Sequence, residues 1–261
     1  MGDVLGLHLL PHLGLVSSPR RSVLARLGPD GGLQALDEVD TDAAIASMLD
    51  SQTASVLVVD APIEVPNADG RRDVESVLAW CDITAFPVST RRLTTVFGGA
   101  RGVGMASTLA DGGRRAIEAL PDQVLRQIAW EREHPIGAPP LALADYRAAW
   151  LGVHPPRHRP KGVGRARPEG IVAAWNLLAE VIDMADWAPA VSPDDWTAIN
   201  DSARIDALCC AYAGMRLRDP DAGMSIGAPG HGEVALAVDA NLRRRLAATL
   251  ERLRAEGTVH I

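Results

Sequence analysis

Apolar runs of strand length, separated by turn residues, dominate the first 60 positions of the chain. Residues 4–9 and 56–59 are almost wholly apolar, and the second run stops at Asp60, shortly before Pro62. A short Val-rich run that ends in this way is typical of a strand buried on both faces. Between the two runs the pattern predicts two more strands, at residues 22–26 and 33–36, and a helix from the N-cap Thr41 to about Asp50.

The later apolar positions mostly recur at helical spacing. Helices are predicted at residues 72–81, 121–133, 171–184, 203–217 and 239–256, with another core element at 141–151 and a strand at 234–238. Residues 86–104 lack such a pattern, which predicts a long loop. The order of elements indicates one α/β domain at residues 1–238, with residues 239–261 as a C-terminal helical addition whose Arg243, Arg244 and Arg245 face outward.

The composition is that of an ordinary globular protein. Hydrophobic residues make up 47% of the 261 positions, and no apolar run reaches the roughly 20 residues that span a bilayer. No basic region precedes the apolar patch at residues 4–10, so we predict no signal peptide. Cys81, Cys209 and Cys210 have the setting of small core residues rather than of disulfides or metal ligands. A cytoplasmic location with no membrane partner is therefore expected.

The charge balance limits what the protein can do with nucleic acid. A formal net charge of −7 argues against coating nucleic acid through bulk electrostatics. An acidic protein can still be a nuclease if its basic side chains gather at one groove. One segment gathers several of them, and it is either part of such a groove or a solvated loop: Arg157, Arg159, Lys161, Arg165 and Arg167.

Two aspartates stand out by their positions. Asp60 follows a buried strand, and open α/β sheets bind ligands at the carboxyl ends of their strands. Asp60 can equally be a residue that turns the chain before Pro62. Asp206 lies at the edge of an apolar helical stripe, next to Ile205, where it is either a solvated rim residue or points into a cleft.

Several segments carry a resemblance to a known family. DAPIEVPN and GRRDVE, AFPVSTRRL, FGGARGVGMA, YRAAWLGVHPPRHRPKGVGRA and RIDALCCAYAGMRL follow one another in the order in which they resemble the DUF429 family. Its members are predicted nucleases of the ribonuclease H-like superfamily, and the resemblance extends to about Glu233. It implies a ribonuclease H-like mixed sheet flanked by helices, and a cluster of acids that holds Mg²⁺ or Mn²⁺.

The resemblance also assigns residues, and one position departs from it. It implies one acid on the first strand, one in a D-x-P strand end and one on a late helix; Asp60 and Asp206 match the last two. His8 stands where the first acid is expected. An imidazole is poorly suited to bridging two hard cations but can bind Mn²⁺ or Zn²⁺. Asp145 or Glu64 would then complete the cluster, and His8 would otherwise be a core histidine.

Two functions follow from these assignments. In the first, the chain is a metal-dependent nuclease in which Asp60 and Asp206 bind metal while Arg71, Lys161 and Arg101 contact phosphate. In the second, the fold persists without catalysis and binds nucleic acid, a nucleotide or a protein partner. The nuclease hypothesis predicts that the carboxylates of Asp60 and Asp206 lie within about 6 Å of each other, with a third acid nearby, so that two metals about 4 Å apart fit. Two distant acids, or convergence of these two acids alone, would favour the second function.

Overall fold

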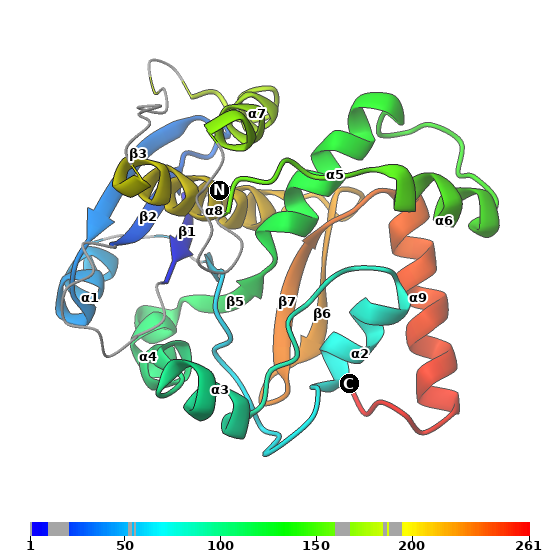
Figure 1. Cartoon of the computed structure of the whole chain (residues 1–261), viewed down its shortest axis with the longest axis horizontal. Helices are drawn as coiled ribbons and strands as arrows, with labels where there is room; N and C mark the ends of the chain where they lie inside the picture. Colours follow the sequence, from blue (N-terminus) through cyan, green and yellow to red (C-terminus); the bar gives the residue numbers. More distant parts are fainter. Residues whose placement is uncertain are drawn as a thin grey trace.

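The structure is a computed structural model that describes residues 2–9, 21–51, 54, 56–159, 168–184, 187 and 195–261. Within these residues a seven-stranded sheet runs through the molecule in the order β3-β2-β1-β4-β5-β7-β6 (Figure 1). The strands are β1 Val4–His8, β2 Ser22–Leu27, β3 Leu33–Val39, β4 Val56–Val59, β5 Arg115–Ala119, β6 Gly223–Ala228 and β7 Gly232–Ala237.

The sheet is mixed, which confirms the α/β class. Strands β1, β4, β5 and β7 are parallel neighbours, whereas β2, β3 and β6 run antiparallel to the strands beside them. Leu7 of β1 is in register with Val59 of β4, so the next residue of each strand, His8 and Asp60, comes to the same edge of the sheet. The parallel register therefore joins two side chains that lie 52 positions apart in the sequence.

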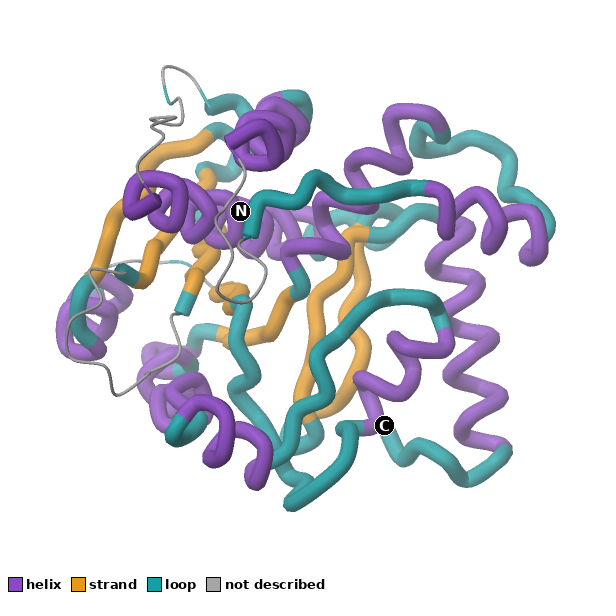
Figure 2. Tube along the Cα trace, in the orientation of Figure 1, coloured by secondary structure: helices purple, strands orange, loops and turns teal. Residues whose placement is uncertain are grey.

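Helices cover both faces of the sheet (Figures 1 and 2). One face packs against α5, α7 and α8, and the other against α1 and α4. Alternate residues of β4 serve the two faces, Val58 toward α8 and Leu57 and Val59 toward α1 and α4, as expected for a strand buried on both sides. The helices are α1 Asp42–Asp50, α2 Asp73–Trp80, α3 Thr90–Phe97, α4 Arg101–Leu109, α5 Pro121–Glu133, α6 Leu143–Gly152, α7 Pro168–Ala179, α8 Asp195–Arg216 and α9 Ala240–Ala255, with a 3₁₀ turn at Asp111–Gly113.

A third core cluster lies where α2, α6 and α9 meet β6 and β7. Figure 1 shows α9 alongside α2, and Leu242, Leu246 and Leu253 of α9 are buried in this cluster. The prediction that Arg245 faces outward is wrong. Its side chain is buried and bonds the carbonyl of Trp80 and the carboxylate of Asp82, so α9 is tied to the end of α2.

Helix α8 lies directly on β1 because both contribute glycine at the contact. A Cβ on Gly6 would lie 2.2 Å from the carbonyl oxygen of Ala207, and one on Gly214 would lie 2.6 Å from the side chain of Val4. Only residues without a side chain allow such an approach. The close contact brings Asp206, the neighbour of Ala207 on α8, to the end of β1.

Residues 86–104 are not the loop that the sequence predicted. They contain α3, whose N-cap Ser89 accepts a hydrogen bond from the Arg92 amide, and the start of α4. One glycine of this segment has a packing role: a Cβ on Gly102, inside α4, would lie 2.4 Å from the carbonyl oxygen of Pro62. Strands β5 and β6 were not predicted either, since RAIEA and GMSIGA lack a clean apolar run.

Candidate metal centre

His8 and Asp60 form the first half of the candidate site, at the ends of the neighbouring strands β1 and β4. The His8 Nδ1 atom lies 2.5 Å from Asp60 Oδ2, and the Leu9 amide donates to Asp60 Oδ1 at 2.9 Å. The Asp60 amide in turn donates to the carbonyl of Leu7 at 3.1 Å. The ladder between the strands thus continues into the side chain of Asp60 and fixes its carboxylate against His8.

Asp206 on α8 supplies the second half. Its Oδ2 atom lies 3.4 Å from His8 Nδ1, and its carboxylate is 2% exposed. His158 Nε2 lies 2.7 Å from Asp206 Oδ1, and Arg159 Nε donates to both oxygens at 3.0 and 2.8 Å. Arg159 Nη2 also reaches Asp60 Oδ2 at 3.4 Å. Asp206 therefore points toward the edge of the sheet and not to solvent. The alternative that it is a solvated rim residue is wrong.

Charge in this buried setting changes how the groups titrate. Burial alone would lower the pKa of His8, but the charge and hydrogen bond of Asp60 and the charge of Asp206 more than offset it, so the pKa is raised. Burial raises the pKa of the Asp206 carboxyl, but Arg159, His158 and His8 together hold it well below its usual range. Asp206 is thus an anion at neutral pH.

The three side chains can hold a metal ion. His8, Asp60 and Asp206 each offer one ligand atom, and these atoms all lie within 4.8 Å of one another. In the part of the chain that the structure describes, no other three His, Cys, Asp or Glu residues converge in this way. One imidazole and two carboxylates form a mixed nitrogen and oxygen set, which suits one divalent ion of borderline hardness. We call these three residues the metal cluster.

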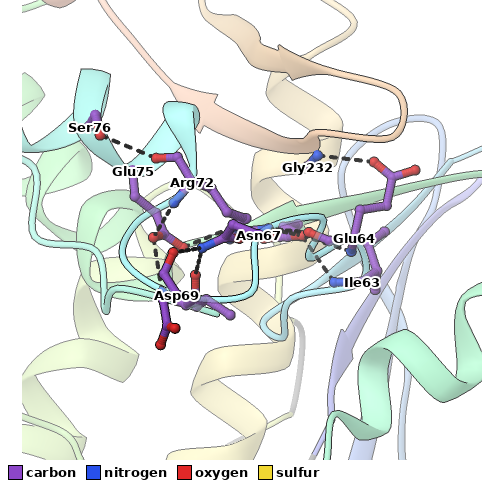
Figure 3. A network of polar contacts seen from close by, with 10 residues as sticks. Ile63, Glu64, Asn67, Asp69, Arg72, Glu75, Ser76 and Gly232 are labelled. Carbon is purple, nitrogen blue, oxygen red and sulfur yellow. Dashed lines mark hydrogen bonds and ion pairs between the residues drawn. The ribbon is translucent and has the colours of Figure 1, made fainter. Parts of the chain in front are cut away.

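A second buried ionic group centres on Arg72 (Figure 3). Arg72 bonds Glu118 of β5 through both terminal nitrogens, at 2.6 and 2.8 Å, and Glu75 of α2 through Nε at 2.9 Å. Glu118 also accepts the amide of Ile63, and Glu75 accepts that of Val88. These bonds fix the two loops that follow β4 and α2. We call Arg72, Glu75 and Glu118 the loop network.

A pocket of about 650 Å³ joins the two groups. It extends from the ends of β1 and β4 past Glu118 of β5 to Val234 of β7 and Leu78 of α2. Its lining includes the metal cluster, the loop network, Arg159 and Asp122, the latter exposed in the first turn of α5. The size is that of a small-molecule binding site.

The other predicted metal ligands, Glu64 and Asp145, lie elsewhere. Glu64 accepts the amides of Gly230 and Gly232 and so anchors the β6–β7 turn (Figure 3). Asp145 is exposed on α6, outside the pocket lining. Neither joins the metal cluster, so the third ligand is the histidine.

The residues predicted to contact phosphate do not all line the pocket. Arg101 lines the pocket, but its guanidinium donates to Asp42 and to Ser22. Arg71 is exposed on the loop before α2 and is not among the residues that line this pocket. Lys161 lies outside the described residues.

Sequence reasoning missed His158 and Arg159. The prolines at 155 and 156 correctly exclude a helical metal motif between His154 and His158, and the extended segment instead delivers His158 alone to Asp206. The only signal for Arg159 is its place in a basic segment. Glu118 was missed because β5 was not predicted. A strand that contains a buried acid lacks the apolar pattern by which strands are recognised.

The fold and this site define a class: an α/β protein with a mixed sheet and a buried histidine–aspartate group able to hold a metal ion. Comparison of the chain with models of protein families, with curated proteins and with solved structures gives no match. Among the helices described, none is long and apolar enough to cross a membrane.

Proposed function

We propose that the chain is a divalent-metal-dependent nuclease of ribonuclease H-like fold, acting on phosphodiesters in the cytoplasm, with one metal ion in place of two. The observation that carries this proposal is the convergence of His8, Asp60 and Asp206 within 4.8 Å at one edge of the sheet. The described elements begin with three strands, a helix and a buried strand that lies beside the first strand. This order agrees with the ribonuclease H-like order that the resemblance implies.

The chemistry of the three ligands supports one choice of metal over the other. Two acids and one histidine leave too few carboxylates to bridge two hard cations, which favours a single Mn²⁺ over a pair of Mg²⁺ ions. Such an ion, when bound, polarises a phosphoryl oxygen and makes bound water a stronger nucleophile. His8, Asp60 and Asp206 would hold this ion, and Arg159, whose guanidinium lies against both carboxylates, would supply positive charge to a phosphoryl group bound there.

A second candidate is a scaffold that binds nucleic acid, a nucleotide or a protein partner without hydrolysis. One observation favours it: the Arg159 guanidinium already bonds both carboxylates, as a metal ion would. In this alternative Arg159 is the permanent counter-ion of Asp60 and Asp206, and the buried acids need no metal.

Calorimetry with Mn²⁺, Mg²⁺ and Zn²⁺ tests the proposal. We expect one equivalent of Mn²⁺ to bind the wild type more tightly than Mg²⁺, and binding to be lost in Asp60→Asn. The control is Asp145→Asn, an exposed acid on α6, which should bind Mn²⁺ normally. Absence of binding to the wild type at millimolar metal, or binding that survives in Asp60→Asn, would reject the metal site and favour the scaffold. Hydrolysis of nucleic-acid substrates with the bound metal then tests the activity itself.

A further inference from the structure

The pocket beside the metal cluster is chemically divided. At the ends of β1 and β4 it is lined by the metal cluster, Arg159 and Asp122. Toward β7 and α2 its lining is mainly apolar: Leu78, Ala85, Phe86, Val88, Leu93, Leu120 and Val234. A ligand that fills the pocket must therefore combine an apolar body with a polar or charged group at one end.

The charges between these two parts are already satisfied. Arg72 donates to Glu118, to Glu75 and to the carbonyl of Glu64, and both glutamates accept further backbone amides. A ligand gains little by bonding to groups so fully paired. The loop network therefore lines the pocket without binding the ligand strongly. The apolar side chains around it determine which ligands fit.

One aromatic side chain marks the apolar part. Phe86 lines the pocket and remains 48% exposed, although the Arg92 guanidinium lies 4.0 Å from its ring centroid. The exposed part of this ring favours a flat aromatic group as its ligand, because the contact buries apolar area on both.

We infer that this pocket binds a nucleoside phosphate, with the base in the apolar part beside Phe86 and the phosphate group at the metal cluster. The substrate is accordingly a free nucleotide or the end of a strand, and not the interior of a duplex. A pocket of about 650 Å³ has room for one nucleotide unit, and a net charge of −7 opposes a long polyanion across the surface. The inference rests on the proposed function only in placing the phosphate at the metal.

The test compares adenosine 5′-monophosphate with ribose 5-phosphate by calorimetry, with and without Mn²⁺. We expect the wild type to bind the nucleotide at least about tenfold more tightly. The preference should collapse in Phe86→Ala, which removes the ring, and in Thr84→Trp, which fills the pocket from an exposed position in its wall. Leu151→Ala is the matched control, since Leu151 is 46% exposed and lies outside the lining.

Equal affinity for the two compounds, or a preference that survives both pocket variants, would overturn the inference. If Mn²⁺ fails to bind, the proposed function fails, while the preference measured without metal still decides whether the pocket binds a base. A linear single-stranded oligonucleotide and a closed circle of the same sequence then compete with the nucleotide. If only the linear form competes, the substrate is a strand end. If neither form competes, the substrate is a free nucleotide. Equal competition by both forms contradicts the inference.

Discussion

The metal cluster and the loop network line the same pocket but are bonded in different ways. In the loop network, Arg72 and backbone amides together donate to all four carboxylate oxygens of Glu75 and Glu118. Each of these donors is a backbone amide or the buried side chain of Arg72. In the metal cluster, the partners of Asp60 and Asp206 include two histidines and a guanidinium that is 39% exposed. Carboxylates that are fully paired with buried donors stabilise the fold. Carboxylates that are paired with a partly exposed guanidinium can exchange that partner for a cation.

Removing Arg72 should give the largest effect, because it breaks the closed network. Arg72→Met leaves two buried carboxylates without their counter-ion, and we expect the free energy of unfolding to fall by about 3–5 kcal/mol. Denaturant titration measures it. Arg71→Met, at the exposed neighbouring position, should change stability by no more than about 0.5 kcal/mol. Similar losses for the two variants would mean that the loop network does not hold the structure.

Moving α8 should break the metal cluster without touching the loop network. In Gly6→Val the new side chain meets the backbone of α8, so we expect a loss of about 3 kcal/mol and a loss of metal binding as Asp206 moves from Asp60. The control is Gly104→Ala in α4, where a Cβ meets nothing within 4 Å and the change should be neutral or slightly stabilising. A Gly6→Val protein that still binds Mn²⁺ like the wild type would show that the approach of α8 does not set the site.

Removing Arg159 should act in the opposite sense to removing Arg72. If the guanidinium competes with a metal ion for Asp60 and Asp206, Arg159→Gln should bind Mn²⁺ about tenfold more tightly. Hydrolysis should nevertheless fall, since a charge that faces the phosphate is lost. Calorimetry and a rate assay separate the two effects. Weaker Mn²⁺ binding in this variant would show that Arg159 supports the site instead of competing for it.

A smaller effect should appear in the pH dependence of the metal-free protein. The folded-state pKa of His8 is raised, so its contribution to stability is fully present below the unfolded value of about 6.5 and is lost as the pH rises through the folded value. The difference in unfolding free energy between wild type and His8→Gln should shrink from pH 5.5 to pH 8.5. Metal affinity should change in the opposite direction, because a metal binds the neutral imidazole. A constant stability difference would contradict the pairing of His8 with Asp60.

Parts of this site could be predicted from the sequence because they follow from local pattern. Two apolar runs predict the strands, and an acid after the second marks the carboxyl end at which His8 and Asp60 meet. The position of Asp206 on a helix was predictable, whereas its direction depended on the contact of Gly6 with α8, a tertiary effect.

Other features of the site could not be predicted, for a physical reason. Glu64 turns away from the cluster because it caps the β6–β7 turn, and β6 carries no clear strand pattern. His158 and Arg159 reach Asp206 from an extended segment whose path is set by tertiary packing and not by periodicity. Loops that return to a distant element are where local sequence rules carry least information.

The most direct test of the account is whether a nitrogen atom of His8 binds the metal. Pulsed electron paramagnetic resonance of the Mn²⁺ complex detects a directly bound nitrogen by its coupling to the unpaired electrons. We predict such a coupling in the wild type, its loss in His8→Gln and its retention in His154→Gln, a change at an exposed histidine. A Mn²⁺ complex without nitrogen coupling, or one whose coupling persists in His8→Gln, would contradict a metal centre built from His8, Asp60 and Asp206.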